Sequence, residues 1–176
     1  MKQLVSFTLN GVPIEVAVKP ELTLLELLRN EIGLTSPKCG CNRGDCGACT
    51  VHLNGLAVKS CTVLALTVEG KSVVTLDGIT PAQGLHPIQQ AFIDAGAVQC
   101  GYCTPGMVMS AKALLDKNLD PSEEEIRAAI SNNLCRCTGY VKIVEAIRLA
   151  AERMRNACDS QTRLITERKD ANIHEL

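Results

Sequence analysis

The sequence predicts an α+β protein with a small N-terminal sheet domain over residues 1–77, an all-α domain of short helices over residues 78–158, and a polar tail over residues 159–176. Three observations support this division. Apolar and polar residues alternate through most of the first part, and helical spacing with capping signals dominates the second. The turn-rich stretch "DGITPAQGL" lies between them and indicates a linker.

Two hairpins are expected in the first domain. The stretches "QLVSFTL" and "VPIEVAV" alternate apolar and polar residues and flank Asn10-Gly11, a dipeptide suited to a type I′ turn. In the same way "CTVHLNGLAVKSC" predicts a hairpin about Asn54-Gly55, and "KSVVTL" at 71–76 predicts a further strand.

A single helix is expected to lie across these hairpins. After Pro20, the stretch "ELTLLELLRNEIG" places its leucines on one helical face, and Gly33 is a suitable C-cap. Two hairpins covered by one helix make a small α+β sheet domain.

The second half is expected to be a bundle of short helices. Ser122 and Glu125 form a capping box after a proline, which predicts the start of one of them. The helical segments are expected near residues 87–95, 105–117, 122–131 and 141–156.

Composition narrows the functional classes. The net charge of −1, without a basic run, and the low aromatic content of 2% argue against nucleic-acid binding. The start, "MKQLVSFTLNGVPIEV", lacks the continuous apolar stretch of a secretory signal, and the run "CTVLALTV" is too short to span a membrane. We therefore expect a soluble, cytoplasmic protein.

Ten cysteines are the dominant feature of this composition. In a reducing cytosol such thiols are expected to bind metal rather than to form disulfides, and thiolates favour zinc, copper(I) or iron–sulfur clusters. None of the histidines has a zinc-finger spacing to a cysteine. All three are expected to be surface or packing residues: His52, His86 and His174.

The first cysteine group has the plant-type ferredoxin spacing for a [2Fe–2S] cluster. Cys41-x4-Cys46-x2-Cys49 is followed by a distant fourth cysteine, Cys61. The alternative is a four-thiolate zinc site that uses Cys39 in place of Cys61. Zinc ribbons, however, pair two short knuckles separated by many residues, and one eleven-residue loop does not make that pattern.

Glycines and a hairpin explain how this loop could close around a cluster. Gly40, Gly44 and Gly47 are expected to take positive φ and to turn backbone N–H groups toward the sulfur atoms. The hairpin after the loop would return Cys61, on a separate strand, towards Cys49.

The second cysteine group is Cys100-x2-Cys103 followed by Cys135-x-Cys137. Both pairs continue as Cys-Thr and precede a helix, so we expect a four-thiolate site between two helix N-termini, whose partial positive charge favours thiolates. The spacing alone also fits a zinc site with four cysteine ligands. A thioredoxin-type dithiol would need a preceding strand in a βαβ unit, and none is evident.

These residues also carry a family resemblance. "GCNRGDCGACTV" with Cys61, "LHPIQQAFIDAGAVQCGYCTPGMVMSA" and "NLCRCTGY" closely resemble the small iron–sulfur subunit of the molybdenum hydroxylases, the family of xanthine dehydrogenase, aldehyde oxidoreductase and aerobic carbon monoxide dehydrogenase. The resemblance covers residues 3–152. It implies a β-grasp ferredoxin-like domain, then a short four-helix bundle whose four cysteines hold a second [2Fe–2S] cluster.

The resemblance also implies a function. A large subunit with a molybdenum-pterin cofactor would oxidise the substrate, and electrons would pass through the second cluster, then the first, to FAD on a medium subunit. The complex would be a dimer of heterotrimers, Gln99 and Cys137 would contact the pterin, and no substrate site is expected here. Two alternatives remain: a freestanding ferredoxin-type shuttle, although such carriers are usually markedly acidic, and a zinc-stabilised interaction module.

Three residues that are not predicted ligands also have expected roles. Cys39 and Cys158 match neither motif and are expected to be small buried hydrophobes. Arg136, between Cys135 and Cys137, is either a plain surface arginine or a cation that raises the cluster potential.

Overall fold

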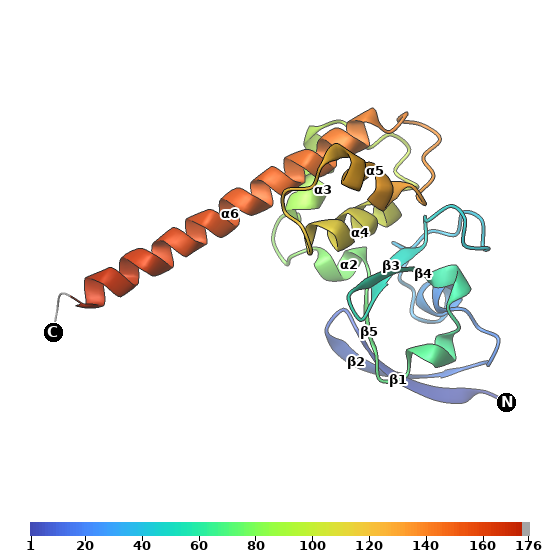
Figure 1. Cartoon of the computed structure of the whole chain (residues 1–176). Coiled ribbons are helices and arrows are strands. Elements are labelled where there is room, and N and C mark those ends of the chain that lie inside the picture. Colours follow the sequence, from blue (N-terminus) through green and yellow to red (C-terminus); the bar gives the residue numbers. More distant parts are fainter. Residues whose placement is uncertain (174–176) are drawn as a thin grey trace.

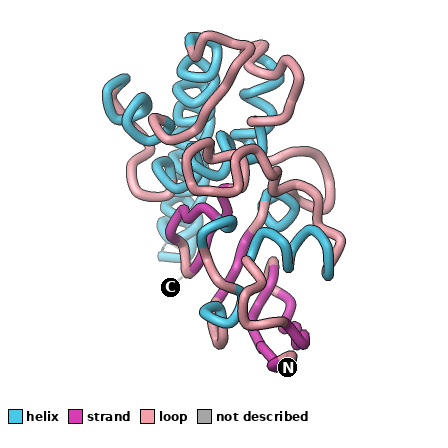
Figure 2. Tube along the Cα trace, turned by 90° about the vertical axis from the view of Figure 1, so that its right-hand side faces the viewer, coloured by secondary structure: helices cyan, strands magenta, loops and turns pink. Residues whose placement is uncertain are grey.

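The computed structural model describes the backbone of residues 1–173 and the side chains of residues 1–160. A sheet lies at one end of the molecule and a group of helices at the other, and the last helix extends away from both (Figure 1). Figure 2 shows loop segments running through the middle of the molecule, between the strands and the helices. In the described part of the chain, no helix is long and apolar enough to cross a membrane.

The N-terminal half is a five-stranded mixed sheet with the strand order β2-β1-β5-β3-β4. The pair β1–β5 is parallel, and the neighbouring pairs are antiparallel. Asn10, Gly11, Asn54 and Gly55 all have positive φ, as type I′ turns require, so both predicted hairpins are confirmed. The strands are β1 (Gln3–Leu9), β2 (Val12–Val18), β3 (Thr50–Leu53), β4 (Leu56–Lys59) and β5 (Ser72–Val74).

The helix that crosses this sheet is shorter and less regular than expected. It begins as α1 (Leu24–Glu26) and continues as a wider π-helical turn, η1 (Leu27–Glu31). The widened turn has an i→i+5 hydrogen bond from the Ile32 N–H to the Leu27 carbonyl, and Gly33, with φ +85°, follows directly after Ile32. All four leucines of the predicted apolar face are buried: Leu24, Leu25, Leu27 and Leu28.

The C-terminal half is helical in the part of the chain that the structure describes. One difference is that the expected linker begins inside a single helical turn, α2. A second difference is that the helix predicted over residues 141–156 continues to Ile173. His174, and the side chains of the tail beyond residue 160, lie outside the described residues. The helices are α2 (Leu76–Ile79), α3 (Pro87–Asp94), α4 (Thr104–Leu115), α5 (Glu123–Ile130) and α6 (Val141–Ile173).

Helix α4 joins the two halves. It packs on β3 and β4 of the sheet as well as on α3 and α5. Across this junction the buried His52 side chain of β3 forms a 2.8 Å hydrogen bond from Nε2 to the Met109 carbonyl oxygen of α4. The molecule therefore has two apolar cores, one in the sheet half and one within the helices, joined through α4.

Candidate iron–sulfur centres

The four thiols of the first group lie together as two contacting pairs. Cys41 touches Cys46, and Cys49 touches Cys61. Cys49 and Cys61 are buried against Leu25 of α1, whereas Cys41 and Cys46 are partly exposed. The site therefore has a closed side against the sheet core and a more open side on the loop.

Backbone N–H groups of the loop point at the first pair. The Sγ atom of Cys41 accepts from the N–H groups of Asp45 at 3.3 Å and Cys46 at 3.4 Å. Backbone donors from Arg43 and then Cys46 lower the pKa of the Cys41 thiol to about 6. A loop that donates several N–H groups to sulfur favours the anionic thiolate, which is the form that binds iron.

The glycines of this loop allow it to fold around the thiols for two different reasons. Gly44 and Gly47 have φ of +92° and +67°, as expected for a loop that turns its N–H groups inward. Gly40 does not have positive φ, so that expectation was wrong for this residue. It is glycine for lack of space, because a Cβ there would lie 2.6 Å from the Cys46 Sγ atom.

Cys61 reaches the loop from a turn rather than from a strand. It lies in the 3₁₀ turn η2 (Ser60–Thr62), directly after β4. Ser60 fixes this turn, because its backbone N–H and its hydroxyl both donate to the Cys49 carbonyl oxygen, at 3.3 and 2.8 Å. Burial, followed by contact with Cys49, raises the pKa of the Cys61 thiol to about 12.

The second group also forms two pairs. The Sγ atoms of Cys100 and Cys137 are 3.6 Å apart, and the thiols of Cys103 and Cys135 contact each other. Cys103 is the N-cap residue of α4, which places it at the positive end of that helix as the sequence predicts. Burial, together with the Cys135 thiol, raises the pKa of Cys103 to about 12.

Cys135 is held by donors from the residues that follow it. Its Sγ atom accepts from the Thr138 hydroxyl at 3.1 Å and from the Thr138 N–H at 3.5 Å. Burial alone would raise the pKa of Cys135, but these donors and the Cys137 N–H lower it overall. The Cys135 N–H in turn donates to the Tyr140 hydroxyl at 2.9 Å.

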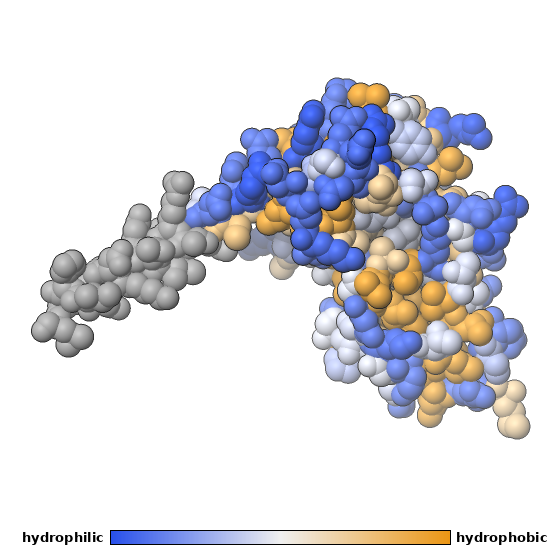
Figure 3. All heavy atoms as spheres, in the orientation of Figure 1, coloured by the Kyte–Doolittle hydropathy of each residue, from blue (hydrophilic) through white to orange (hydrophobic). Residues whose placement is uncertain are grey.

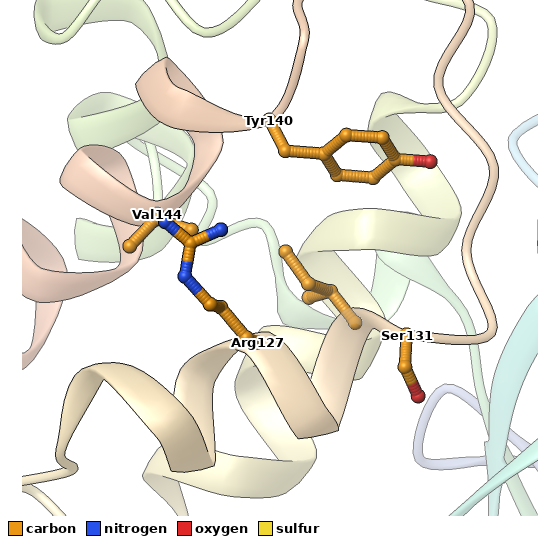
Figure 4. Close-up of a pocket in the computed structure, with 5 residues that line it drawn as sticks. Arg127, Ser131, Tyr140 and Val144 are labelled. Atoms are coloured by element: carbon orange, nitrogen blue, oxygen red, sulfur yellow. The ribbon is translucent and has the colours of Figure 1, made fainter.

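Tyr140 braces this loop from the start of α6. The Tyr140 hydroxyl in turn donates to the Asn133 carbonyl oxygen at 3.1 Å, so one side chain bonds to both peptide groups that flank Leu134. Its φ of +71° is unusual for a bulky residue. Figure 4 shows the ring across a pocket of about 160 Å³ from Arg127 of α5 and Val144 of α6. Tyr140 therefore separates this pocket from the cysteine loop.

The pairwise arrangement fits a binuclear cluster. A [2Fe–2S] cluster is held by four cysteine thiolates, two on each iron, and the two contacting pairs in each group match this requirement. Among the described residues, no three histidine, cysteine, aspartate or glutamate side chains converge as ligands of one metal ion would. Both sites are thus built from two contacting pairs of cysteine thiols.

The two sites differ in exposure. In the second site Cys135 is buried and Cys103 partly buried, but Cys100 and Cys137 are exposed, as are the neighbouring Gln99 and Arg136. Apolar side chains close in sequence to these four cysteines are exposed as well: Val98, Tyr102, Leu134 and Val141. Figure 3 also shows apolar surface on the N-terminal half, where Leu4, Val12, Leu56 and Leu64 are exposed.

The cysteines outside the motifs are not buried, and that expectation was wrong for both. Cys39 and Cys158 are exposed. Cys39 lines a hollow beside α1 and η1, together with Leu25 and Arg29, and its carbonyl oxygen accepts from the Tyr102 hydroxyl at 2.8 Å. This contact joins the first cysteine loop to the Cys100–Cys103 turn.

Sequence reasoning missed the residues that support the cysteines. Thr138 and Tyr140 were visible in "NLCRCTGY", but nothing in that pattern indicates that their hydroxyls bond to the loop. Tyr102, between two predicted ligands, was missed for the same reason. Such contacts depend on the tertiary fold, and local spacing carries no signal for them.

Comparison with known families identifies both halves. Residues 7–73 match the family described as a 2Fe-2S iron-sulfur cluster binding domain, and residues 75–148 match the family described as a [2Fe-2S] binding domain. Together the two matches cover most of the chain and contain both cysteine groups.

Curated relatives also match this chain along most of their own length. The nicotinate dehydrogenase small FeS subunit of Eubacterium barkeri is 52% identical over 86% of this chain and 97% of its own length. The xanthine dehydrogenase iron-sulfur-binding subunit of Escherichia coli O157:H7 is 47% identical over 80% of this chain and 89% of its own.

Among solved structures, quinoline 2-oxidoreductase from Pseudomonas putida 86 contains a chain that superposes with a TM-score of 0.85 at 41% identity, covering 88% of this chain and 97% of that one. The aldehyde oxidoreductase of Desulfovibrio desulfuricans superposes equally well, with a TM-score of 0.85 at 45% identity over 88% of this chain. There the match covers only 17% of a much longer chain.

Proposed function

Because this chain belongs to the family of two-cluster [2Fe–2S] small subunits of the molybdenum hydroxylases, we propose that it carries electrons between the partner subunits of such a complex. The observation that carries this proposal is the pair of thiol quartets, each divided into two contacting pairs, on loops that touch each other. The complex as a whole is an oxidoreductase.

Each quartet is proposed to hold one [2Fe–2S] cluster, which when bound takes up and releases one electron at a time. This chain's residues supply the thiolates, turn N–H and hydroxyl donors toward them, and shield the inner pairs from water. The ligands of the first cluster are Cys41, Cys46, Cys49 and Cys61, and those of the second are Cys100, Cys103, Cys135 and Cys137.

The exposure of the second site supports a direction for the electrons. Cys100 and Cys137 on its open side are exposed, and so are apolar residues that neighbour the four cysteines in sequence, as expected of a surface that a partner covers. We place the molybdenum-pterin cofactor of a large subunit here, with Gln99 and Cys137 in contact with the pterin. The first site then passes electrons to FAD on a medium subunit, in a dimer of heterotrimers.

Substrate choice belongs to the large subunit in this proposal. Relatives named for nicotinate, xanthine and caffeine are 43–52% identical to this chain, so similar small subunits serve different substrates. The chain's contribution is the same for each of them, namely the transfer of electrons away from the substrate site.

The second candidate is a freestanding electron shuttle. A diffusing carrier needs to be steered to several partners by charge, and this chain has a net charge of only −1. The apolar surface around the open cluster site also favours a fixed partner over a transient one.

Purification of the chain with its native partners, followed by metal and flavin analysis, tests the proposal. We expect a brown complex with about two irons and two sulfides per cluster, together with molybdenum and FAD in the same particle. A colourless chain with tightly held zinc would overturn the cluster assignment. A brown chain that purifies alone, and is reduced by several unrelated enzymes, would favour the shuttle.

A further inference from the structure

The two candidate cluster sites touch through the backbone. The Leu134 N–H donates to the Cys46 carbonyl oxygen at 2.9 Å. Cys46 is a proposed ligand of the first cluster, and Leu134 is bonded directly to Cys135, a proposed ligand of the second. One peptide and one hydrogen bond therefore separate the ligands of the two centres.

A buried side chain holds this contact in place. Asn133 precedes Leu134 and is only 4% exposed. Its Nδ2 donates to the Gly47 carbonyl oxygen at 3.1 Å, and its Oδ1 accepts from the Ser110 hydroxyl of α4 at 2.8 Å. A buried amide is costly unless both ends are paired, and here each end is paired with a different part of the molecule.

The packing around Gly47 leaves no room for a side chain at this position or at Gly106, which lies against it. A Cβ on Gly47 would lie 2.4 Å from the Asn132 carbonyl oxygen and 2.6 Å from the Asn133 Nδ2. A Cβ on Gly106 of α4 would lie 2.2 Å from the Gly47 carbonyl oxygen. That carbonyl also accepts from the Thr50 hydroxyl and N–H, at 2.7 and 3.1 Å, which ties it to β3.

We propose that Asn133 is a positioning residue that sets the electronic coupling between the two clusters by holding the Leu134 N–H against the Cys46 carbonyl. The inference rests on the proposed function. The step concerned is a one-electron transfer, in which the reduced second cluster is oxidised and the oxidised first cluster is reduced. No bond or proton moves. Ser110 orients the amide so that its NH₂ group faces Gly47.

The test is Asn133→Asp in the purified complex, with Asn132→Asp as the matched control. The introduced carboxylate would turn an acceptor oxygen toward the Gly47 carbonyl, and the repulsion would withdraw Leu134 from Cys46. Asn132 is exposed, so the same chemical change one residue earlier leaves the contact intact. Both variants are first checked for full iron content and for the signals of both clusters.

The deciding readout is the rate at which the second cluster reduces the first, followed in the purified complex by rapid mixing with EPR detection of each cluster. We expect this rate to fall in N133D, because the Leu134 N–H no longer meets the Cys46 carbonyl, and to be unchanged in N132D. An unchanged rate in N133D, with both clusters present, overturns the inference and leaves the proposed function standing.

Two further results are distinguishable. A wild-type complex without two [2Fe–2S] signals would overturn the proposed function itself. If N133D does not yield a folded complex, Ser110→Ala decides, because it removes only the hydroxyl that orients the amide. Slower reduction of the first cluster by the second in S110A supports the inference, and a wild-type rate overturns it.

Discussion

At the scale of single residues, the identity of the fourth ligand of the first cluster separates the iron–sulfur interpretation from the zinc interpretation. Cys61 touches Cys49 in the buried half of the site, whereas Cys39 is exposed and lines a hollow beside α1. This geometry supports the proposed ligand set, in which Cys61 from a separate turn, and not Cys39 from the loop itself, is the fourth ligand.

We therefore expect Cys61→Ser to remove or badly perturb the first cluster, while Cys39→Ser leaves both clusters in place. The physical reason is that a serine at 61 leaves one iron with a single thiolate from its pair. Iron content and low-temperature EPR measure this. Loss of a cluster in the Cys39 variant, with retention in the Cys61 variant, would show that the ligand assignment is wrong.

The Thr138 hydroxyl donates to the Sγ atom of Cys135, a proposed ligand of the second cluster, at 3.1 Å, and we expect this bond to tune the potential of that cluster. A hydrogen bond to a charged group is worth about 1.5–3 kcal/mol, and about 1.4 kcal/mol corresponds to about 59 mV for a one-electron couple. The bond stabilises the more negative reduced state more than the oxidised state, so only part of this energy affects the potential.

We expect Thr138→Val to lower the potential of the second cluster by on the order of tens of millivolts, while that of the first stays unchanged. Redox titration followed by EPR resolves the two clusters. Thr138→Ser keeps the hydroxyl and serves as the control. Equal potentials in the valine and serine variants would mean that this hydroxyl does not tune the cluster.

At the scale of elements, local signals predicted most of the structure, and tertiary contacts explain the differences. The strands β1 and β2 and the capping box of α5 follow directly from alternation and from Ser122 with Glu125. The π-helical turn η1 was not predicted, because an apolar face indicates a helix but not how wide its turns are. The capping box of Thr23 with Glu26 was also missed, although its S/T-x-x-E pattern is visible in the sequence.

The N-terminal end of α4 depends on a glycine. Replacing a helical glycine with alanine ordinarily stabilises a protein by about 0.4–1 kcal/mol. At Gly106 we expect the opposite sign, a loss of about 1–3 kcal/mol, because the added Cβ would lie 2.2 Å from the Gly47 carbonyl oxygen. Chemical denaturation of Gly106→Ala and of wild type measures this difference in the free energy of unfolding. A neutral or stabilised variant would show that α4 can move away from the first cysteine loop at little cost.

At the scale of the whole molecule, spacing indicated which cysteines belong together but not how the two sites face each other. The contacts of Asn133 with Gly47 and of His52 with Met109 join residues far apart in the sequence. No periodicity or motif encodes such pairs. The exposure of Cys100 and Cys137 was likewise unpredictable, since helical spacing does not show which side of a loop a partner covers.

We expect the contact of His52 with Met109, which joins the two halves, to weaken as the pH falls. Burial lowers its pKa from 6.5 and outweighs the opposing effect of the Met109 carbonyl, while the nearby Lys112 lowers it further. The native state therefore holds His52 neutral, with Nε2–H donating to Met109. As the pH falls below 6.5, the unfolded chain takes up a proton that the folded chain does not, so stability is present above this pH and is lost below it.

We expect the free energy of unfolding of wild type to fall between pH 7.5 and pH 5.5 more steeply than that of His52→Gln, which has no imidazole to protonate. Comparing the two proteins at each pH removes the contributions of acid-sensitive clusters and of His86, whose pKa burial also lowers. At pH 7.5 the variant should be less stable by about 1–3 kcal/mol, as expected when a buried hydrogen bond is disturbed, and the gap should narrow towards pH 5.5. Parallel curves would mean that His52 keeps the same charge in the folded and unfolded chains.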